Sequence, residues 1–362
     1  MKQRALFFIC LACVFLIFSC KGKEKPSITA KLVTEGSGIN DRSYNAAAWE
    51  GVLSFYGDVR GEEEGFGVCY DIVPCRETAQ MVSVLKQVAT DAPDLIITTG
   101  FVFQSALSFV APIFPDQKFL NIDSTVDEAS NVLSFLFAAE EGSFLVGVAA
   151  ALQSIADGVA NPSFGFIGGI PGDIILDFEV GYIQGIRHVL PDAPIYEYYA
   201  GDWTKPELAA AIAKEWYDEK NVYAIYSAAG ATGNGTIAQA VAHRKLGKNV
   251  WAIGVDRDQF EEGSYGVGKS AVLTSMVKKV DQAVKYGLSQ VQKNTFAGGT
   301  VVLGLKQGAV GYTVTNEDFN ADVKKQMTGI MANIIAENIK VAGVQTDRAK
   351  VLDIVSTIKG EM

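Results

Sequence analysis

The stretch NVLSFLFA, residues 131–138, decides how the chain is organised. It carries the aromatic and aliphatic residues of a buried strand, yet it follows another strand-like run, Phe119 to Asp123, without a helical segment between the two. Elsewhere short apolar runs mostly alternate with helix-period segments, which is the pattern of βα units around a parallel sheet. We therefore interpret residues 131–138 as the point where the chain crosses from one α/β lobe to the next.

Further strands are predicted on both sides of this crossing: Ile28 to Glu35, Phe66 to Val73, Leu95 to Thr99, Phe164 to Gly168, Ile195 to Tyr199, Val222 to Ser227, Val250 to Val255 and Ala271 to Met276. A second crossing is expected after Val255, where the polar segment DRDQFEEGSYGVGKS begins, and a third near Thr300. The predicted N-terminal lobe comprises residues 28–136 and 256–299, and the C-terminal lobe comprises residues 137–255 and 300–362. Two doubly wound lobes joined by three crossings enclose a cleft that suits a ligand.

The N-terminus is typical of an exported protein. Lys2 and Arg4 precede an apolar run that is shorter than the roughly 20 residues needed to cross a bilayer. The run ends in Ile17-Phe18-Ser19-Cys20, which resembles the lipobox of bacterial lipoproteins. This predicts a signal peptide over residues 1–19, a lipid on Cys20, and a tether over residues 20–27 that holds the protein body at a bacterial membrane, outside the cytoplasm. An ordinary signal peptide with an incidental cysteine is the alternative.

The acidic composition excludes several classes of function. The chain has 31 Lys and Arg against 41 Asp and Glu, a net charge of −10, so nucleic acid is not an expected partner. It has 2 histidines, His188 and His243, and no zinc-type spacing, so neither a metal nor a cofactor is expected. Cys69 and Cys75 could be bridged in an oxidising compartment or remain free thiols, and the sequence leaves both open.

The segment GSYGVGKS, residues 263–270, matches the phosphate-binding pattern G-x-x-x-x-G-K-[ST]. Such a loop works only between a buried strand and a helix that aims its first N–H groups at the phosphates. Here the acidic DRDQFEE precedes the motif and the strand-like AVLTSMV follows it. We therefore predict a flexible surface loop rather than a nucleotide site.

Candidate binding residues follow the predicted strands, because ligands of open α/β sheets bind beyond the carboxyl ends of the strands. They are Asp41, Ser43, Tyr44, Asn45, Asp123, Phe178, Trp203, Gly230, Asp256 and Lys278. Ser43 could instead cap a helix, and the aromatic residues could belong to the core. Aromatic faces suit a flat ring, whereas carboxylates and a lysine suit hydroxyl groups, so the set predicts a heterocycle joined to a sugar. Because no nucleophile with a base accompanies them, an enzyme is not expected.

Several motifs occur along the chain in an order that resembles a known protein family. GINDRSYNAAAWEG, FAAEEGSFLVGVAAAL, IGGIPGDIILDFEVGYIQG, SAAGATGNG, WAIGVDRDQ and TSMVKKVDQAV together resemble the basic membrane protein family of substrate-binding lipoproteins. The resemblance covers essentially the whole mature chain. It implies an α/β type I periplasmic-binding-protein fold and delivery of purine nucleosides, such as adenosine, guanosine or inosine, to an ABC transporter permease.

The same resemblance implies roles for six residues. Tyr44 and Phe178 are expected to sandwich the purine, Asn45 and Asp123 to read its polar edge, and Asp256 and Lys278 to hold the ribose hydroxyls. Asp41, Ser43, Trp203 and Gly230 are expected to line the site. Many relatives have phenylalanine where this chain has Tyr44, which keeps the stacking face and adds a hydroxyl group.

Three other functions stay open at this point. A sugar-binding protein of the same fold would use the same carboxylates, and a surface antigen or adhesin would need no ligand. An enzyme, either an ATPase built on residues 263–270 or a nucleoside hydrolase that uses Asp123 or Asp256, is the remaining alternative. The protein is expected to be a monomer.

Overall fold

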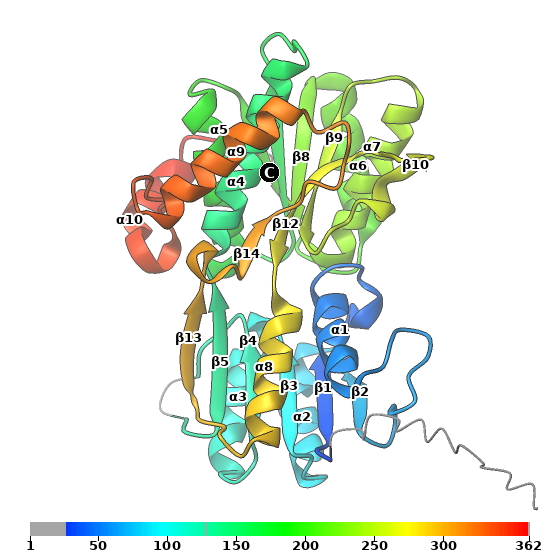
Figure 1. Ribbon diagram of the computed structural model, residues 1–362, viewed down its shortest axis with the longest axis vertical. Helices are drawn as coiled ribbons and strands as arrows, with labels where there is room; N and C mark the ends of the chain where they lie inside the picture. Colours follow the sequence, from blue (N-terminus) through cyan, green and yellow to red (C-terminus); the bar gives the residue numbers. More distant parts are fainter. Residues whose placement is uncertain (1–26, 127–128, 361–362) are drawn as a thin grey trace, which may run out of the picture.

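The computed structural model describes residues 27–126 and 129–360, which form two α/β lobes that lie one above the other in Figure 1. The predicted signal peptide, Cys20 and the tether up to residue 26 lie outside the described residues. Within the described part, no helix combines the length and the apolar character that a bilayer span requires.

The lower lobe in Figure 1 is built on a parallel sheet in the order β13-β5-β4-β3-β1-β2. Its strands are β1 (Ala30–Thr34), β2 (Tyr70–Pro74), β3 (Leu95–Thr99), β4 (Phe119–Ile122), β5 (Val132–Phe137) and β13 (Gly299–Leu303). Helices α1 (Tyr44–Tyr56) and α8 (Val280–Gln292) pack together in one apolar core, whereas α2 (Met81–Thr90) and α3 (Gln104–Val110) belong to a second core. The central strands β3 and β4 are buried along their whole length, as expected for a parallel sheet with helices on both faces.

The upper lobe has a sheet in the order β14-β12-β9-β8-β6-β7-β15, parallel except for the pairing of β14 with β12. Its strands are β6 (Ser163–Gly168), β7 (Ile195–Tyr199), β8 (Val222–Ala228), β9 (Trp251–Asp256), β12 (Val272–Lys278), β14 (Val310–Tyr312) and β15 (Lys359–Gly360). The helices are α4 (Ala139–Ala156), α5 (Asp173–Val189), α6 (Pro206–Glu219), α7 (Asn234–Lys245), α9 (Ala321–Ile335) and α10 (Val344–Val355). Helices α4 and α5 pack closely, while α9 and α10 contact their outer sides.

Three glycines let α4 and α5 approach each other. A Cβ on Gly147 would collide with the backbone carbonyl of Tyr182, and one on Gly185 would collide with that of Phe144. Gly181 meets the backbone of Glu140 in the same way. The close approach fixes the first turn of α4 against α5, beside the cleft between the lobes.

All ten predicted strands are present, with ends that differ by a few residues from the expected ones. The crossing expected after Val255 is wrong. Strand β12 pairs in parallel with β9, so residues up to Lys278 stay in the upper lobe, and the chain crosses between β12 and α8. The third crossing follows β13 rather than preceding it, because residues 299–303 pair with β5 in the lower sheet. Residues 256–278, predicted in the N-terminal lobe, therefore lie in the upper lobe, and residues 300–303, predicted in the C-terminal lobe, lie in the lower lobe.

Residues 263–270 form a short hairpin rather than the flexible loop that the sequence predicted. Strands β10 (Ser264–Gly266) and β11 (Lys269–Ser270) pair antiparallel around an exposed turn in which Gly268 adopts a φ of +66°. The 3-10 helix Glu261–Gly263 precedes the hairpin, and strand β12 follows it. The strand and helix that a phosphate-binding loop needs are thus absent from this part of the described chain.

Lys269→Ala is expected to leave ligand binding unchanged. Lys269 is exposed in the hairpin and does not line the pocket between the lobes. Calorimetric titration of the variant with the ligand of the parent protein checks this. A clear loss of affinity would indicate that the hairpin takes part in binding, as a phosphate site would.

Cys69 and Cys75 are both free thiols, the first partly exposed and the second buried. Of the two states that the sequence left open, the bridge is therefore not formed.

Candidate functional site

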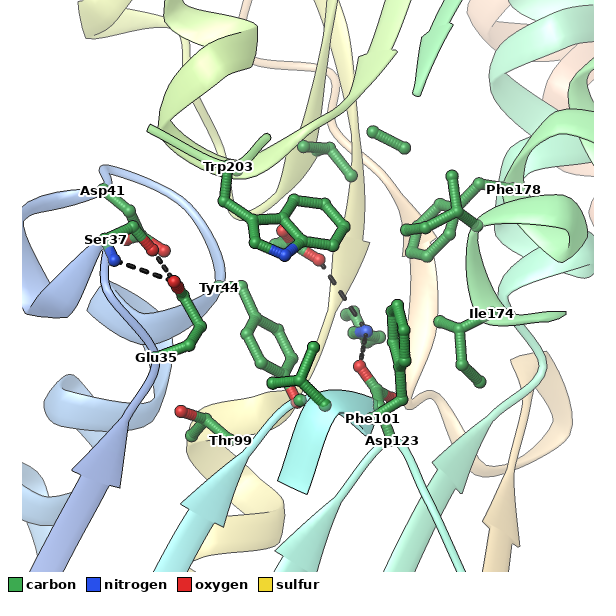
Figure 2. A pocket seen from close by; sticks show the side chains of 18 residues that line it. Glu35, Ser37, Asp41, Tyr44, Thr99, Phe101, Asp123, Ile174, Phe178 and Trp203 are labelled. Atoms are coloured by element: carbon green, nitrogen blue, oxygen red, sulfur yellow. Dashed lines mark hydrogen bonds and ion pairs between the residues drawn. The ribbon is translucent and has the colours of Figure 1, made fainter. Parts of the chain in front are cut away.

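The carboxyl ends of the strands meet in a small pocket between the lobes (Figure 2). Its volume is about 70 Å³, room for a few water molecules, so a larger ligand can enter only if the lobes or some side chains move. The lining residues are Glu35, Ser37, Asp41, Tyr44, Thr99, Gly100, Phe101, Val102, Asp123, Ile174, Ile175, Phe178, Trp203, Ala228, Gly230, Val255, Asp256 and Lys278.

Lys278 lies between two carboxylates at the centre of this pocket. Its Nζ is 2.5 Å from Asp123 Oδ2 and 3.9 Å from Asp256 Oδ1, and Asp123 comes from the opposite lobe. The three residues are at most 7% exposed. Burial raises the pKa of Asp256, while Lys278 and a hydrogen bond from Ser43 act against this rise. One buried cation therefore faces two buried carboxyl groups.

Asp123 and Asp256 also share an uncommon backbone conformation. Asp123 directly follows β4 with a φ of +67°, and Asp256 ends β9 with a φ of +66°. Aspartate tolerates this left-handed region better than most residues do, but a cost remains that the surrounding structure must offset. Such strain is concentrated at ligand sites, where it aims a side chain that a regular strand would direct elsewhere.

Two aromatic rings face the same volume from opposite lobes. The Lys278 Nζ lies 4.7 Å from the centroid of the Tyr44 ring and 5.2 Å from that of Phe178. Phe178 is 2% exposed and also packs against Tyr226, so it belongs both to the pocket wall and to the core. Burial, then the carboxylates of Asp123 and Asp256, raise the pKa of Tyr44 well above its ordinary value. Its hydroxyl group is therefore protonated at neutral pH.

Phe101 and Trp203 close the pocket from the lower and the upper lobe. Their rings meet edge to face with centroids 6.2 Å apart. The indole lies on Gly169 and Gly230, and a Cβ on Gly169 would collide with it. Figure 2 shows Trp203 above Tyr44, on the side of the pocket away from Thr99.

Asp41, rather than Ser43, caps helix α1. The carboxylate of Asp41 accepts hydrogen bonds from the backbone N–H groups of Ser43, Asn45 and Ala46 at 2.8–3.0 Å. Its burial nevertheless raises its pKa to about 6. The Ser43 hydroxyl is free of the capping role that the sequence allowed it, and it donates across the cleft to Asp256 Oδ2 at 2.6 Å.

The start of α1 is bound to the upper lobe at two further points. The Asn234 side chain donates to the carbonyl of Asp41, and the Gln259 side chain donates to the carbonyl of Arg42, both at 3.0 Å. Gln259 also accepts from the N–H of Val255, at the end of β9. These bonds hold the lobes in a closed arrangement.

Asn45 does not line the pocket, although the sequence placed it at the ligand. Its amide nitrogen donates to Glu35 Oε1 at 2.7 Å, and its amide oxygen accepts from the Thr99 hydroxyl at 2.6 Å. Glu35 in turn accepts from the N–H and the hydroxyl of Ser37, and burial raises its pKa. Asn45 therefore positions Glu35, which lines the pocket and which the sequence reasoning assigned to a strand.

The structure thus brings together eight of the ten candidate residues in the pocket lining: Asp41, Tyr44, Asp123, Phe178, Trp203, Gly230, Asp256 and Lys278. Ser43 and Asn45 lie directly behind the wall. Phe101 was missed, although its segment TTGFVFQSA follows a predicted strand, which was the available signal. The apolar pair Ile174 and Ile175 was missed as well, because it resembles an ordinary helix face.

Residues 28–345 match the family described as ABC transporter substrate-binding protein PnrA-like. The chain is 34% identical to the CD4+ T-cell-stimulating antigen of Listeria monocytogenes, over 88% of this chain and 89% of the relative. It is 32% identical to the ABC transporter nucleoside-binding protein BmpA of Lactococcus lactis, over 94% of this chain and 99% of the relative.

Among solved structures, an ABC transporter solute-binding protein of Aeropyrum pernix K1 is 25% identical. It superimposes with a TM-score of 0.78, and the match covers 91% of this chain and 96% of that protein.

Proposed function

Since the chain belongs to the Bmp family of PnrA-like ABC transporter substrate-binding proteins, we propose that it captures purine nucleosides between its lobes and delivers them to an ABC transporter permease. The family is one of binding proteins rather than enzymes. The family resemblance and the α/β fold of the periplasmic-binding-protein type, both expected from the motifs, are confirmed.

The proposal rests on one arrangement, the aromatic rings of both lobes beside a lysine held by two carboxylates. A purine has two flat faces for the rings of Tyr44 and Phe178, and base stacking on an aromatic ring contributes about 1 to 3 kcal/mol. Asp256 Oδ1 is buried and accepts no hydrogen bond from any described residue, so it is available to a sugar hydroxyl. The Lactococcus relative is named as a nucleoside-binding protein, which supports the same ligand class.

Ligand entry requires a shift of Lys278. Its Nζ lies over both rings, so the centroids of the Tyr44 and Phe178 rings are less than 10 Å apart. A base stacked on both rings needs about 7 to 8 Å between them. The base therefore takes the volume that the ammonium group fills, and the ammonium group moves off the ring faces to donate to sugar hydroxyls. A ligand that contacts both lobes in this way stabilises the closed state.

Phe178→Ala is expected to weaken nucleoside binding about 5- to 150-fold, the equivalent of the stacking energy of about 1 to 3 kcal/mol. Calorimetric titration measures this, with the folded fraction checked first, because Phe178 is also a core residue. Phe178→Leu is the control, since it keeps most of the core volume and loses the aromatic face. Unchanged affinity in both variants would place Phe178 in the core alone.

The ligand class is tested on protein purified without added ligand, which is denatured, filtered and analysed for released small molecules by ultraviolet absorbance and mass. We expect a purine nucleoside in stoichiometric amount, or micromolar or tighter binding of inosine, guanosine or adenosine to the ligand-free protein. Binding of ribose in preference to inosine would favour a sugar-binding protein. If no small molecule binds, a role as a surface antigen or adhesin is favoured for this chain; the Listeria relative is named as an antigen.

Membrane attachment through a lipid on Cys20 belongs to the same proposal, which places the protein body outside the cytoplasm. It rests on the lipobox-like Ile17-Phe18-Ser19-Cys20, which lies outside the described residues. Cys20→Ala is expected to release the protein from the membrane fraction, and the mass of the N-terminal peptide shows whether acyl chains are present. A variant that stays in that fraction would contradict the lipid anchor.

A further inference from the structure

A second, larger cavity adjoins the pocket. Its volume is about 650 Å³, and it shares Phe101, Asp123 and Ile174 with the pocket as common walls. The lower lobe supplies further walls from the start of α3, the segment after β4 and the end of β5. The upper lobe supplies the first turns of α4, α5 and α10, and the third crossing supplies the segment after β13. A ligand that extends from the pocket past Asp123 therefore enters this larger cavity.

The walls of this cavity are strongly acidic. Its carboxyl groups are those of Asp123, Glu140, Glu141, Asp173 and Asp177. Lys306 is the basic residue among the described lining residues, and it is exposed. This cavity therefore has a negative electrostatic potential.

Four of the five carboxyl groups have partners. Asp123 pairs with Lys278, Asp173 with Arg348 at 2.8 Å, Glu141 with the N–H of Leu305 at 2.7 Å, and Asp177 with the N–H of Val344 at 2.6 Å. These bonds account for the positions of the four side chains and leave Glu140 as the exception.

Glu140 is a buried acid without such a partner. It is 8% exposed, and apart from its own backbone N–H no residue of the described ranges 27–126 and 129–360 donates a hydrogen bond to its carboxyl group. Gly343 leaves it room, because a Cβ there would lie 2.7 Å from the carboxyl carbon. Burial, and then the charges of Asp177 and Glu141, raise the pKa of Glu140 to about 8. A buried, unpaired carboxyl group that faces a cavity is suited to a cationic ligand group.

We infer that this cavity is a subsite for a primary ammonium substituent of the ligand, with Glu140 as its carboxylate partner. The inference rests on the proposed function, since it concerns the part of a nucleoside derivative that extends beyond the nucleoside pocket. An ammonium group has three donors for the surrounding carboxylates, whereas a phosphate group would be repelled by all of them. No group of three or more His, Cys, Asp or Glu side chains in the described part is placed to hold a metal ion, which leaves an organic cation as the matching chemistry.

The test is a calorimetric comparison of adenosine with 5′-amino-5′-deoxyadenosine, N6-(2-aminoethyl)adenosine and adenosine 5′-monophosphate. The two amines carry the ammonium group at opposite ends of the nucleoside. We expect one of them to bind about tenfold more tightly than adenosine, the effect of one charged hydrogen bond, and the monophosphate to bind more weakly. Glu140→Gln should remove the gain and leave adenosine binding unchanged, while Glu317→Gln, at an exposed position away from the cavity, should keep the gain.

Proton release gives a second readout that needs no variant. Below its pKa of about 8 Glu140 is protonated, so an ammonium group must displace that proton, and the gain in affinity should grow as the pH rises from 6 to 8.5. Titration at pH 7 in buffers of different ionisation enthalpy should show proton release for the tighter amine but not for adenosine. The other charged groups around the cavity also act on Glu140 and on the bound ammonium group. They are Asp123, Glu141, Asp173, Asp177, Lys306 and the ion-paired Arg348.

The outcomes separate the two proposals. If adenosine binds and neither amine binds more tightly, or if the gain survives in Glu140→Gln, the subsite is wrong and the proposed function stands. If neither adenosine nor either amine binds at millimolar concentration, both proposals are overturned.

Discussion

Lys278→Met is expected to lower the free energy of unfolding by about 3 kcal/mol at pH 7 and to abolish ligand binding. Lys278 is 3% exposed and is the cation that lies between the buried carboxyl groups of Asp123 and Asp256. Removing one member of a buried ion pair typically costs about 3 to 5 kcal/mol, because the remaining charge is left without compensation. Chemical denaturation at fixed pH measures the loss in stability, and calorimetric titration measures the loss of binding.

The loss should depend on pH in a defined direction. Burial already raises the folded-state pKa of Asp256, and loss of the opposing lysine charge raises it further above the unfolded value of about 3.9, so the folded variant binds more protons than the unfolded chain. Its stability therefore falls as the pH rises above about 4, and the difference from the parent protein is larger at pH 7 than at pH 5. A loss of equal size at both pH values would contradict this account.

Lys279→Met is the matched control. Lys279 is the neighbouring residue at the same junction between β12 and α8, and it is exposed. Its replacement should change the free energy of unfolding by less than about 0.5 kcal/mol, as is usual for surface positions. If both variants lose the same stability, the effect arises from the junction and not from the buried charge.

The strands could be predicted because most of them are buried on both faces and therefore appear as continuous apolar runs. Because buried strands of both sheets appear as similar apolar runs, the sequence does not show which sheet a strand joins. The run Ala271 to Met276 shows that a strand is buried, but only its pairing with β9 places it in the upper lobe. Strand β13 was not predicted. It lies at the edge of the sheet and is mostly exposed, so its sequence lacks the pattern of a buried strand.

The pocket could be predicted in large part because ligand residues follow the strands, as Asp123 and Asp256 do. The exceptions were decided by contacts between residues far apart in the sequence. Asp41 and Ser43 are both suitable caps for α1, and the choice falls on Asp41 because Ser43 bonds to Asp256, 213 residues away. Asn45 is turned to Glu35 and Thr99, a pairing that no local pattern shows.

Asp256→Asn is expected to weaken nucleoside binding by about 30- to 150-fold and to leave the binding of the free base nearly unchanged. In the proposed complex the Oδ1 of Asp256, which accepts no hydrogen bond from a described residue, accepts one from a sugar hydroxyl. A hydrogen bond to a charged group contributes about 2 to 3 kcal/mol, which corresponds to this range of affinity. Calorimetric titration with adenosine and adenine side by side measures the ratio.

Asparagine is the cleaner replacement because Asp256 has a φ of +66°, a conformation that asparagine tolerates and alanine does not. Asp256→Ala adds a backbone cost of about 1 to 2 kcal/mol and should weaken nucleoside binding further. Ser43→Ala separates the two roles of the carboxylate, since it removes the bond across the cleft and keeps the charge. Equal losses for adenosine and adenine in Asp256→Asn would show that Asp256 acts on closure of the lobes and not on the sugar, because closure serves both ligands alike.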